Sequence, residues 1–208
     1  MKMSVHGEVP ARRFFAERLR EVPVLAILRG LSPEEGVARA EACWNAGIQL
    51  LEVSLSDEAG LPALEALSAR DRPSGSAVGA GTIIDERMTG AALDAGATFF
   101  VSPGIDERVA VTARQRRIPL LPGVATPTDI QAALSLGWDV VKMFPASLLG
   151  AAWLDAMKDP FPQVSFVATG GVTPDNAQDF LSHGAAGVAM GSALDPARAG
   201  QLRSAGSL

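Results

Sequence analysis

Short apolar runs alternate with longer, mixed segments along almost the whole chain. The runs occupy residues 24–28, 50–54, 77–80, 99–102, 120–122, 140–144, 165–169 and 187–190. Runs that are apolar at consecutive positions are typical of strands buried on both faces of a parallel sheet, whereas half-exposed strands alternate between apolar and polar residues. The pattern therefore predicts eight parallel strands, each followed by a helix that covers the sheet.

The segments between the runs carry signals for the beginning and the end of helices. Ser32 is a good N-cap, and it precedes a proline and two acidic residues that suit the first turn of a helix. Glycine after the last helical residue ends a helix in a left-handed conformation, and Gly47, Gly96, Gly137 and Gly184 each stand before a predicted strand. We expect helices over residues 32–47, 59–69, 85–96, 106–117, 126–137, 151–158 and 173–184, with a short one at the end.

Eight strand–helix units of about 20–25 residues match the number that closes a (β/α)8 barrel, the TIM barrel fold. The alternative is an open doubly wound sheet, but no G-x-G-x-x-G motif follows the first run. Residues 11–21 have helical composition, with Phe14, Phe15 and Leu19 spaced to share one face. We predict an α/β protein with a single (β/α)8 barrel domain over residues 1–208, a short N-terminal helix at 11–21 and a loose leader at 1–10.

The composition limits the classes of function. The 208 residues are 48% hydrophobic and 20% charged, so the chain can bury a large core. A formal net charge of −5 argues against a general role in binding nucleic acids or membrane surfaces. No apolar run reaches the about 18 residues of a membrane helix, the N-terminus lacks a signal-peptide core, and Cys43, the one cysteine, permits no intrachain disulfide. We expect a cytoplasmic protein with no nucleic-acid or membrane partner.

Two histidines and one cysteine leave little for metal or triad chemistry. His6 lies in the polar leader, and His183 lies where a helix is expected to end. A transition-metal site or a Ser-His-Asp triad needs ligands or a histidine base that this inventory does not supply. We therefore expect neither a bound metal nor a cofactor.

One lysine lies inside an apolar strand. The chain has three lysines against fifteen arginines, and Lys142 is flanked by Val141 and Met143. Burial disfavours the charged form of an amine, so the pKa of Lys142 is expected to fall, and a neutral amine is a nucleophile towards carbonyl groups. The alternative is a structural lysine whose stem packs on apolar surface while its ammonium group reaches water.

A second charged residue lies in an apolar strand. In barrels of this kind the chemistry lies at the carboxyl ends of the strands, where Lys142 stands in the sixth predicted strand and Glu52 in the second. A buried carboxylate needs a partner or becomes protonated. Glu52 is therefore either the partner of Lys142 in a structural ion pair or a general base beside an amine nucleophile.

Glycine-containing turns follow the seventh and eighth predicted strands. The N–H groups of Gly170 and Gly171, next to an expected helix N-terminus, and those of Gly191 and Ser192 are placed to bind a phosphate, as these two loops often do in the fold. The alternative is a pair of tight turns that require glycine. Arg29, directly after the first strand, either binds a substrate carboxylate through its forked guanidinium or caps the rim of the barrel.

A lysine nucleophile, an acid, a carboxylate-binding arginine and a phosphate site together fit one reaction class. A neutral lysine condenses with a 2-oxo acid to give an iminium ion, which acts as an electron sink while a C–C bond breaks or forms. A base moves the proton that this step requires. These residues therefore point to Schiff-base aldol chemistry, which needs no metal and no cofactor.

Seven phrases at the strand ends resemble the 2-keto-3-deoxy-6-phosphogluconate (KDPG) / 4-hydroxy-2-oxoglutarate (KHG) aldolase family, class I aldolases on a (β/α)8 barrel. They occur in order between residues 22 and 194, which is nearly the whole chain. The phrases are Leu51-Glu52-Val53, Gly79-Ala80-Gly81-Thr82, Val101-Ser102-Pro103-Gly104, Leu121-Pro122-Gly123, Val141-Lys142-Met143-Phe144-Pro145, Thr169-Gly170-Gly171-Val172 and Met190-Gly191-Ser192.

The resemblance implies a role for the residues at the strand ends. Lys142 is the lysine that forms the Schiff base, and Glu52 is the general acid and base, working through a water molecule. Thr82 helps to hold the carboxylate of the pyruvyl group. The phosphate is held by Gly170, Gly171, Gly191 and Ser192, and the pocket is lined by Pro103, Phe144 and Thr169. The resemblance also implies a homotrimer.

One departure from the family pattern bears on the substrate. Some members carry an arginine four residues after the glutamate, where this chain has Ser56. Other members place an arginine at the end of the first strand, as Arg29 does here, and that form also occurs in the branch acting on the galactonate epimer. The expected reaction of this lyase is the cleavage of KDPG, or its galactonate epimer, to pyruvate and glyceraldehyde 3-phosphate, in carbohydrate metabolism such as the Entner–Doudoroff pathway.

Three other functions are consistent with parts of the pattern. The same site suits the cleavage of unphosphorylated KHG to pyruvate and glyoxylate. A barrel that binds phosphorylated ligands without catalysis has no use for Lys142 beside Glu52. A sugar-phosphate isomerase on this scaffold needs an acid–base pair but no neutral lysine.

Overall fold

The computed structural model describes residues 11–203, so the leader expected at residues 1–10 lies outside the described residues. Nine strands form one sheet of parallel pairs, in the order β5-β4-β3-β2-β1-β9-β8-β7-β6. The strands are β1 (Val24–Leu28), β2 (Leu50–Ser54), β3 (Ala77–Gly81), β4 (Phe100–Val101), β5 (Leu120–Leu121), β6 (Gly123–Val124), β7 (Val140–Met143), β8 (Ser165–Thr169) and β9 (Gly187–Met190).

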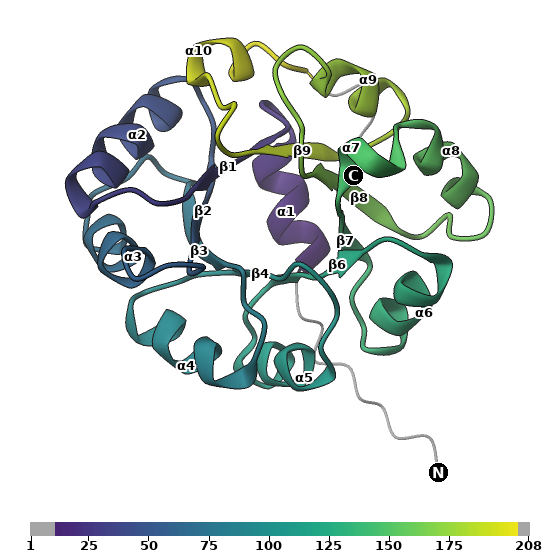
Figure 1. Cartoon of the computed structure of the whole chain (residues 1–208), viewed down its shortest axis with the longest axis horizontal. Coiled ribbons are helices and arrows are strands. Elements are labelled where there is room, and N and C mark those ends of the chain that lie inside the picture. Colours follow the sequence, from purple (N-terminus) through teal and green to yellow (C-terminus); the bar gives the residue numbers. More distant parts are fainter. Residues whose placement is uncertain (1–10, 204–208) are drawn as a thin grey trace.

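Pro122 divides the fifth predicted strand into β5 and β6, which stand at the two ends of the strand order. A proline has no N–H to donate to a neighbouring strand, so the ladder is interrupted there. The Pro122 carbonyl still accepts a hydrogen bond from the N–H of Lys142 (2.8 Å). Only Pro122 separates β5 and β6 in the chain, although they are the first and the last strand of the sheet. The sheet must therefore curl round until its two edges meet, which gives a nearly closed barrel (Figure 1). The (β/α)8 prediction is confirmed, with its fifth strand in two parts.

Helices form a ring around the strands, except for the first, which lies across the middle of the ring in Figure 1. The helices are α1 (Ala11–Leu19), α2 (Pro33–Asn45), α3 (Gly60–Ser68), α4 (Glu86–Asp94), α5 (Glu107–Arg116), α6 (Pro127–Ser135), α7 (Ala146–Leu149), α8 (Ala152–Lys158), α9 (Ala177–Ser182) and α10 (Pro196–Ala199).

Helix α1 covers the end of the barrel at which the strands begin. Phe15 is fully buried and packs edge-to-face on Phe99, just before β4, with ring centroids 5.8 Å apart. Arg12 donates to the carboxylate of Asp139, just before β7 (2.8 Å). This packing closes the amino end of the barrel and leaves the carboxyl ends of the strands for a site.

The helix signals in the sequence are found where they were expected. Ser32 forms a capping box with Glu35, since its hydroxyl accepts the Glu35 N–H (3.2 Å) and the Glu35 carboxylate accepts the Ser32 N–H (2.8 Å). The glycines predicted to end four helices all have φ between 83° and 88°, as the left-handed conformation requires: Gly47, Gly96, Gly137 and Gly184.

Three boundaries differ from the prediction. The fourth strand covers only Phe100 and Val101, and a short extra helix, α7, precedes the helix expected at 151–158. The helix expected from Thr173 begins only at Ala177, because the side chain of Asn176 accepts the Thr173 N–H (2.8 Å) and holds these residues in a turn.

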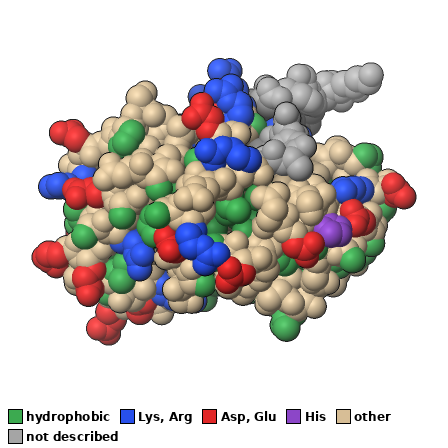
Figure 2. All heavy atoms as spheres, turned by 90° about the horizontal axis from the view of Figure 1, so that it is seen from above, with side chains coloured by type: hydrophobic (Ala, Val, Ile, Leu, Met, Phe, Trp, Pro, Cys, Tyr) green, Lys and Arg blue, Asp and Glu red, His purple; other side chains and the backbone are tan. Residues whose placement is uncertain are grey.

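The surface in Figure 2 carries acidic and basic side chains interspersed with small apolar areas. Within residues 11–203, no helix is long and apolar enough to cross a membrane. The most exposed large apolar side chains are Leu148 in α7 (83% exposed) and Ile84 between β3 and α4 (58% exposed). Both follow the carboxyl ends of strands, on the same side of the barrel as the predicted site.

Candidate active site

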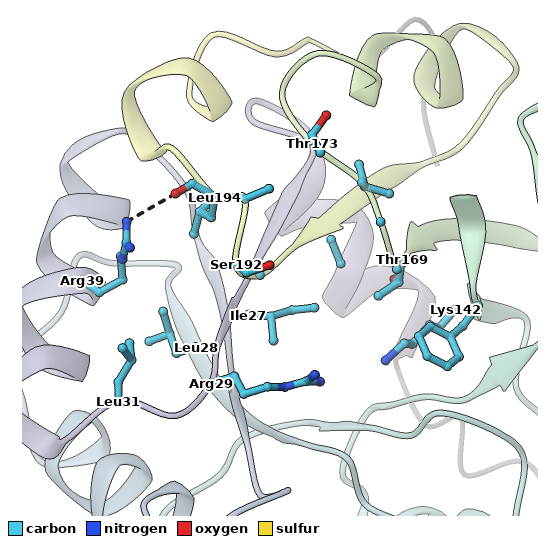
Figure 3. Close-up of a pocket in the computed structure, with 17 residues that line it drawn as sticks. Ile27, Leu28, Arg29, Leu31, Arg39, Lys142, Thr169, Thr173, Ser192 and Leu194 are labelled. Atoms are coloured by element: carbon cyan, nitrogen blue, oxygen red, sulfur yellow. Dashed lines mark hydrogen bonds between the residues drawn. The ribbon is translucent and has the colours of Figure 1, made fainter. Parts of the chain in front are cut away.

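Lys142 is the third residue of β7 and lies at the open end of the barrel. Its residue is only 6% exposed, and its Nζ lies 4.9 Å from the centre of the Phe144 ring. Figure 3 shows the amino group pointing into a cavity. Burial lowers the pKa of Lys142; the charge of Glu52 opposes this, and the charge of Arg29 adds to it. The expected fall in the pKa of this amine is therefore confirmed.

Glu52 is the middle residue of β2 and is 1% exposed. Its carboxyl group lies against Gly81 of β3, and a Cβ on that residue would overlap Oε1. Its Oε2 is buried without a hydrogen-bond partner among the described residues. Burial raises the pKa of Glu52, while the positive charges of Lys142 and Arg29 hold the rise back. Such a carboxyl group holds a proton more readily than an exposed one.

Lys142 and Glu52 influence each other without forming a contact ion pair. In the part of the chain that the structure describes, no carboxylate oxygen lies within 4.0 Å of the Lys142 amine. The interaction is therefore a through-space one that shifts both pKa values. Of the two interpretations drawn from the sequence, the structural ion pair is not formed.

Arg29 follows β1 and extends over the cavity towards Lys142 (Figure 3). Its side chain is exposed, so its guanidinium remains accessible to a ligand. Its positive charge lowers the pKa of Lys142 and also that of Glu52. An arginine that faces a nucleophilic amine in this way suits a ligand whose carboxylate binds the guanidinium beside that amine.

A cavity of about 480 Å³ opens at the carboxyl ends of the strands. Eight of the eleven residues expected in the site line it: Arg29, Lys142, Phe144, Thr169, Gly170, Gly171, Gly191 and Ser192. Nine further residues complete the lining: Ile27, Leu28, Leu31, Arg39, Val172, Thr173, Ala189, Ala193 and Leu194. The strand-end rule thus brings together side chains that are more than 160 positions apart, such as Arg29 and Ser192.

The other three expected residues, Glu52, Thr82 and Pro103, lie outside the lining of this cavity. Thr82 follows β3 with φ of 60°, a left-handed conformation that is rare for a β-branched residue. Its hydroxyl lies 2.9 Å from that of Ser54, which lies 3.0 Å from that of Ser56. Ser56, where some relatives carry arginine, therefore joins a cluster of three hydroxyl groups beside Glu52 on β2.

The Gly170-Gly171 turn is fixed by its carbonyl groups. The Gly170 carbonyl accepts the Ser147 N–H (2.9 Å), and the Gly171 carbonyl accepts the side-chain amide of Asn176 (3.0 Å). Within residues 11–203, the N–H groups of Gly170, Gly171, Gly191 and Ser192 donate to no backbone or side-chain acceptor. They are therefore available to a ligand. The expectation that a helix begins directly behind this turn is wrong, since α9 begins only at Ala177.

Two residues at the candidate site were not predicted from the sequence. Arg39 of α2 lines the cavity and donates to the Leu194 carbonyl (3.3 Å), a contact across 155 positions that no local pattern signals. Asn176 holds the Gly-Gly turn, and its place after Thr173-Pro174-Asp175 was a signal for a side-chain-bonded turn instead of a helix start.

Comparison with known proteins gives a consistent result. A family model described as KDPG and KHG aldolase matches residues 15–204. The 2-dehydro-3-deoxy-phosphogluconate aldolase of Treponema pallidum is 37% identical over 184 residues, covering 88% of this chain and 85% of that protein. The crystal structure of the KDPG aldolase of Zymomonas mobilis with 3-phosphoglycerate superposes with a TM-score of 0.83 at 30% identity, covering 94% and 99% of the two chains. The crystal structure of the KDPG aldolase of Legionella pneumophila, with pyruvate captured as a covalent carbinolamine, superposes with a TM-score of 0.78 at 33% identity. The match covers 90% of this chain and 89% of that one.

The charges around Lys142 predict opposite effects of two substitutions. Arg29→Met is expected to raise the pKa of Lys142 and Glu52→Gln to lower it, because Arg29 disfavours the ammonium form and Glu52 favours it. The pH dependence of Lys142 modification by an amine-selective reagent, followed by peptide mass, measures both shifts. Lys158, an exposed lysine 2.9 Å from Asp155, is the internal control. Shifts of Lys142 in the same direction in both variants would contradict this electrostatic account.

Proposed function

The chain belongs to the KDPG and KHG aldolase family, and we propose that it is a class I aldolase in which Lys142 forms a Schiff base with the substrate. The proposed substrate is KDPG or its galactonate epimer, cleaved to pyruvate and glyceraldehyde 3-phosphate. The observation that carries the proposal is a buried lysine with a lowered pKa, aimed into a cavity beside a buried carboxyl group. A role in carbohydrate metabolism, as in the Entner–Doudoroff pathway, follows from this reaction.

The neutral amine of Lys142 is proposed to attack the C2 carbonyl of the substrate. The resulting carbinolamine loses water to give an iminium ion, which draws electrons from the C3–C4 bond as the C4 hydroxyl loses its proton. Glyceraldehyde 3-phosphate leaves, the enamine is protonated at C3, and water releases pyruvate and the free amine. The carbinolamine of pyruvate in the Legionella relative supports the first step by analogy.

Glu52 is proposed to move the protons of this sequence. A carboxyl group whose pKa burial has raised, and whose Oε2 has no partner, is suited to taking a proton and returning it. Because Glu52 does not line the cavity itself, the proposal includes a water molecule between its carboxyl group and the substrate.

The two anionic ends of the substrate are proposed to bind at different strand ends. Arg29 holds the pyruvyl carboxylate near Lys142. The resemblance adds the hydroxyl of Thr82, which lies outside the cavity lining and would have to leave Ser54 to reach the ligand. The phosphate binds the unpaired N–H groups of the loops after β8 and β9, at Gly170, Gly171, Gly191 and Ser192. Phe144 and Thr169 provide the wall between them, and Pro103, which the resemblance adds to it, lies outside the cavity lining. The Zymomonas relative with 3-phosphoglycerate supports a phosphate-bearing ligand.

A second candidate reaction is the cleavage of KHG to pyruvate and glyoxylate, because the matching family model covers KHG aldolases as well. Binding without catalysis is less well supported, since it gives no reason for a lysine that is desolvated beside Glu52. Lys142 also argues against a sugar-phosphate isomerase, because such an enzyme needs an acid–base pair but no neutral lysine.

We also propose a cytoplasmic homotrimer. Leu148, which is 83% exposed, and Ile84 are apolar side chains on the carboxyl-end face, where contact with another copy would remove them from water. The native mass of the purified protein by light scattering is expected to equal three chains. A monomer at working concentration would contradict the trimer without touching the proposed chemistry.

Borohydride reduction in the presence of pyruvate tests the Schiff base. We expect one pyruvyl group to become irreversibly attached to Lys142, because reduction converts the iminium ion to a stable secondary amine. Mass measurement of the intact protein and of its peptides identifies the position. Lys142→Met should abolish the adduct, while the matched surface variant Lys158→Met should keep it. No adduct in the wild-type protein, or an adduct on another lysine, would rule out the proposed mechanism.

Substitution of Glu52 separates proton transfer from binding. Glu52→Gln keeps the size of the side chain but is unable to exchange a proton, so turnover should fall by about 10²–10⁴-fold. The borohydride adduct on Lys142 should still form, which shows that the barrel is folded and the amine accessible. Steady-state cleavage assays on the purified variant measure the first effect. Near-normal turnover would remove Glu52 from the proposed role.

A further inference from the structure

The cavity is basic although the protein is acidic. Its seventeen lining residues include three basic side chains, Arg29, Arg39 and Lys142, and no aspartate or glutamate, whereas the whole chain has a net charge of −5. The two arginines are positively charged whatever the state of the Lys142 amine. A concave site lined by one sign of charge concentrates ligands of the opposite sign. The cavity is therefore built for an anion.

The three basic side chains lie at two ends of the cavity. Arg29 and Lys142 point towards each other on one side (Figure 3). Arg39 comes from α2 and lies on the other side, next to Leu194. Arg39 is thus the basic side chain of the lining that hydrogen-bonds to the loop after β9. In that loop the N–H groups of Gly191 and Ser192 donate to no acceptor among residues 11–203.

The guanidinium of Arg39 is held in place but largely unused. One Nη1–H donates to the Leu194 carbonyl at 3.3 Å, a long bond, and the group has five N–H donors in total. Among the described residues it forms no ion pair. Glu35, one turn earlier on the same helix, is engaged in the capping box with Ser32. The remaining donors of Arg39 are therefore available to a ligand.

We propose that Arg39 binds the terminal phosphate of the substrate and thereby sets the preference for phosphorylated substrates. This inference rests on the proposed aldolase function, and it adds a residue that the motif phrases do not contain. Backbone N–H groups supply dipoles to a phosphate, whereas a guanidinium supplies a full charge and a planar fork that matches two phosphate oxygens. The bond to Leu194 orients that fork towards the loop after β9.

The test compares binding at the two ends of the cavity in Arg39→Ala. The KM for the phosphorylated substrate that the wild type cleaves is expected to rise by about 10–100-fold with little change in kcat, the scale of a charge-assisted hydrogen bond in uniform binding. The concentration of pyruvate that half-saturates borohydride trapping on Lys142 should stay unchanged, because pyruvate carries no phosphate. Inorganic phosphate should inhibit substrate cleavage by the wild type more strongly than cleavage by the variant.

Two further variants of Arg39 separate charge from loop positioning. Arg39→Gln keeps an N–H donor for the Leu194 carbonyl but loses the charge, so it should behave like Arg39→Ala. Arg39→Lys keeps the charge and should recover part of the affinity. A wild-type KM in Arg39→Gln would overturn the proposal, because it would assign to Arg39 only the support of the loop.

Arg114→Ala is the matched control. Arg114 of α5 also donates Nη1–H to a backbone carbonyl on another segment, that of Leu136 (3.4 Å), but it does not line the cavity. Its substitution should leave the KM unchanged. An unchanged KM in Arg39→Ala, with pyruvate trapping intact, would refute the role of Arg39 alone. Failure of trapping in the wild type would instead refute the aldolase proposal.

Discussion

The constraint on which the site depends is the burial of an amine and a carboxyl group at one end of an apolar barrel. Burial lowers the pKa of Lys142 and raises that of Glu52, so the two values approach each other. Each shift also reduces the free energy of unfolding at every pH at which that group is charged in the unfolded chain. The reason is that the folded protein disfavours the charged form. The core that α1 closes at the amino end, with Phe15 and Leu19 fully buried, offsets this loss.

Space at the strand ends is created by glycine. The Glu52 carboxyl group occupies the position that a Cβ of Gly81 would need, and the backbone of Pro103 occupies the equivalent position beside Gly123. Glu52 is thus positioned by packing instead of by hydrogen bonds, which leaves its Oε2 without a partner in the described structure. A carboxyl group held in this way retains the capacity to bond to water or substrate, which a fully hydrogen-bonded one would lose.

Features that depend on neighbouring residues were predictable, and those that depend on distant contacts were not. The strand runs, the Ser32 cap and the left-handed glycines follow from local propensity, and the strand-end rule then gathered Lys142 and Arg29 into one cavity. The delayed start of α9 escaped prediction because the Asn176 side chain competes with the helix for the Thr173 N–H. Arg39 escaped because its partner Leu194 lies on a loop that only the closed barrel brings near.

The position of the arginine after β1 instead of after β2 has an electrostatic consequence for the proposed reaction. From position 29 its charge reaches both Lys142 and Glu52 and lowers both pKa values, which favours a neutral amine and an ionised carboxylate before the substrate binds. In the proposed reaction, a substrate carboxylate bound to Arg29 would offset that charge, so the pKa of Glu52 would rise once the cavity is filled. Glu52 would then hold a proton more readily at the stage of the proposed sequence at which the carbinolamine loses water. Arg29 would in this way couple recognition of the 2-oxo acid to the proton transfers that follow. Ser56, four residues after Glu52, carries no charge and has no such effect.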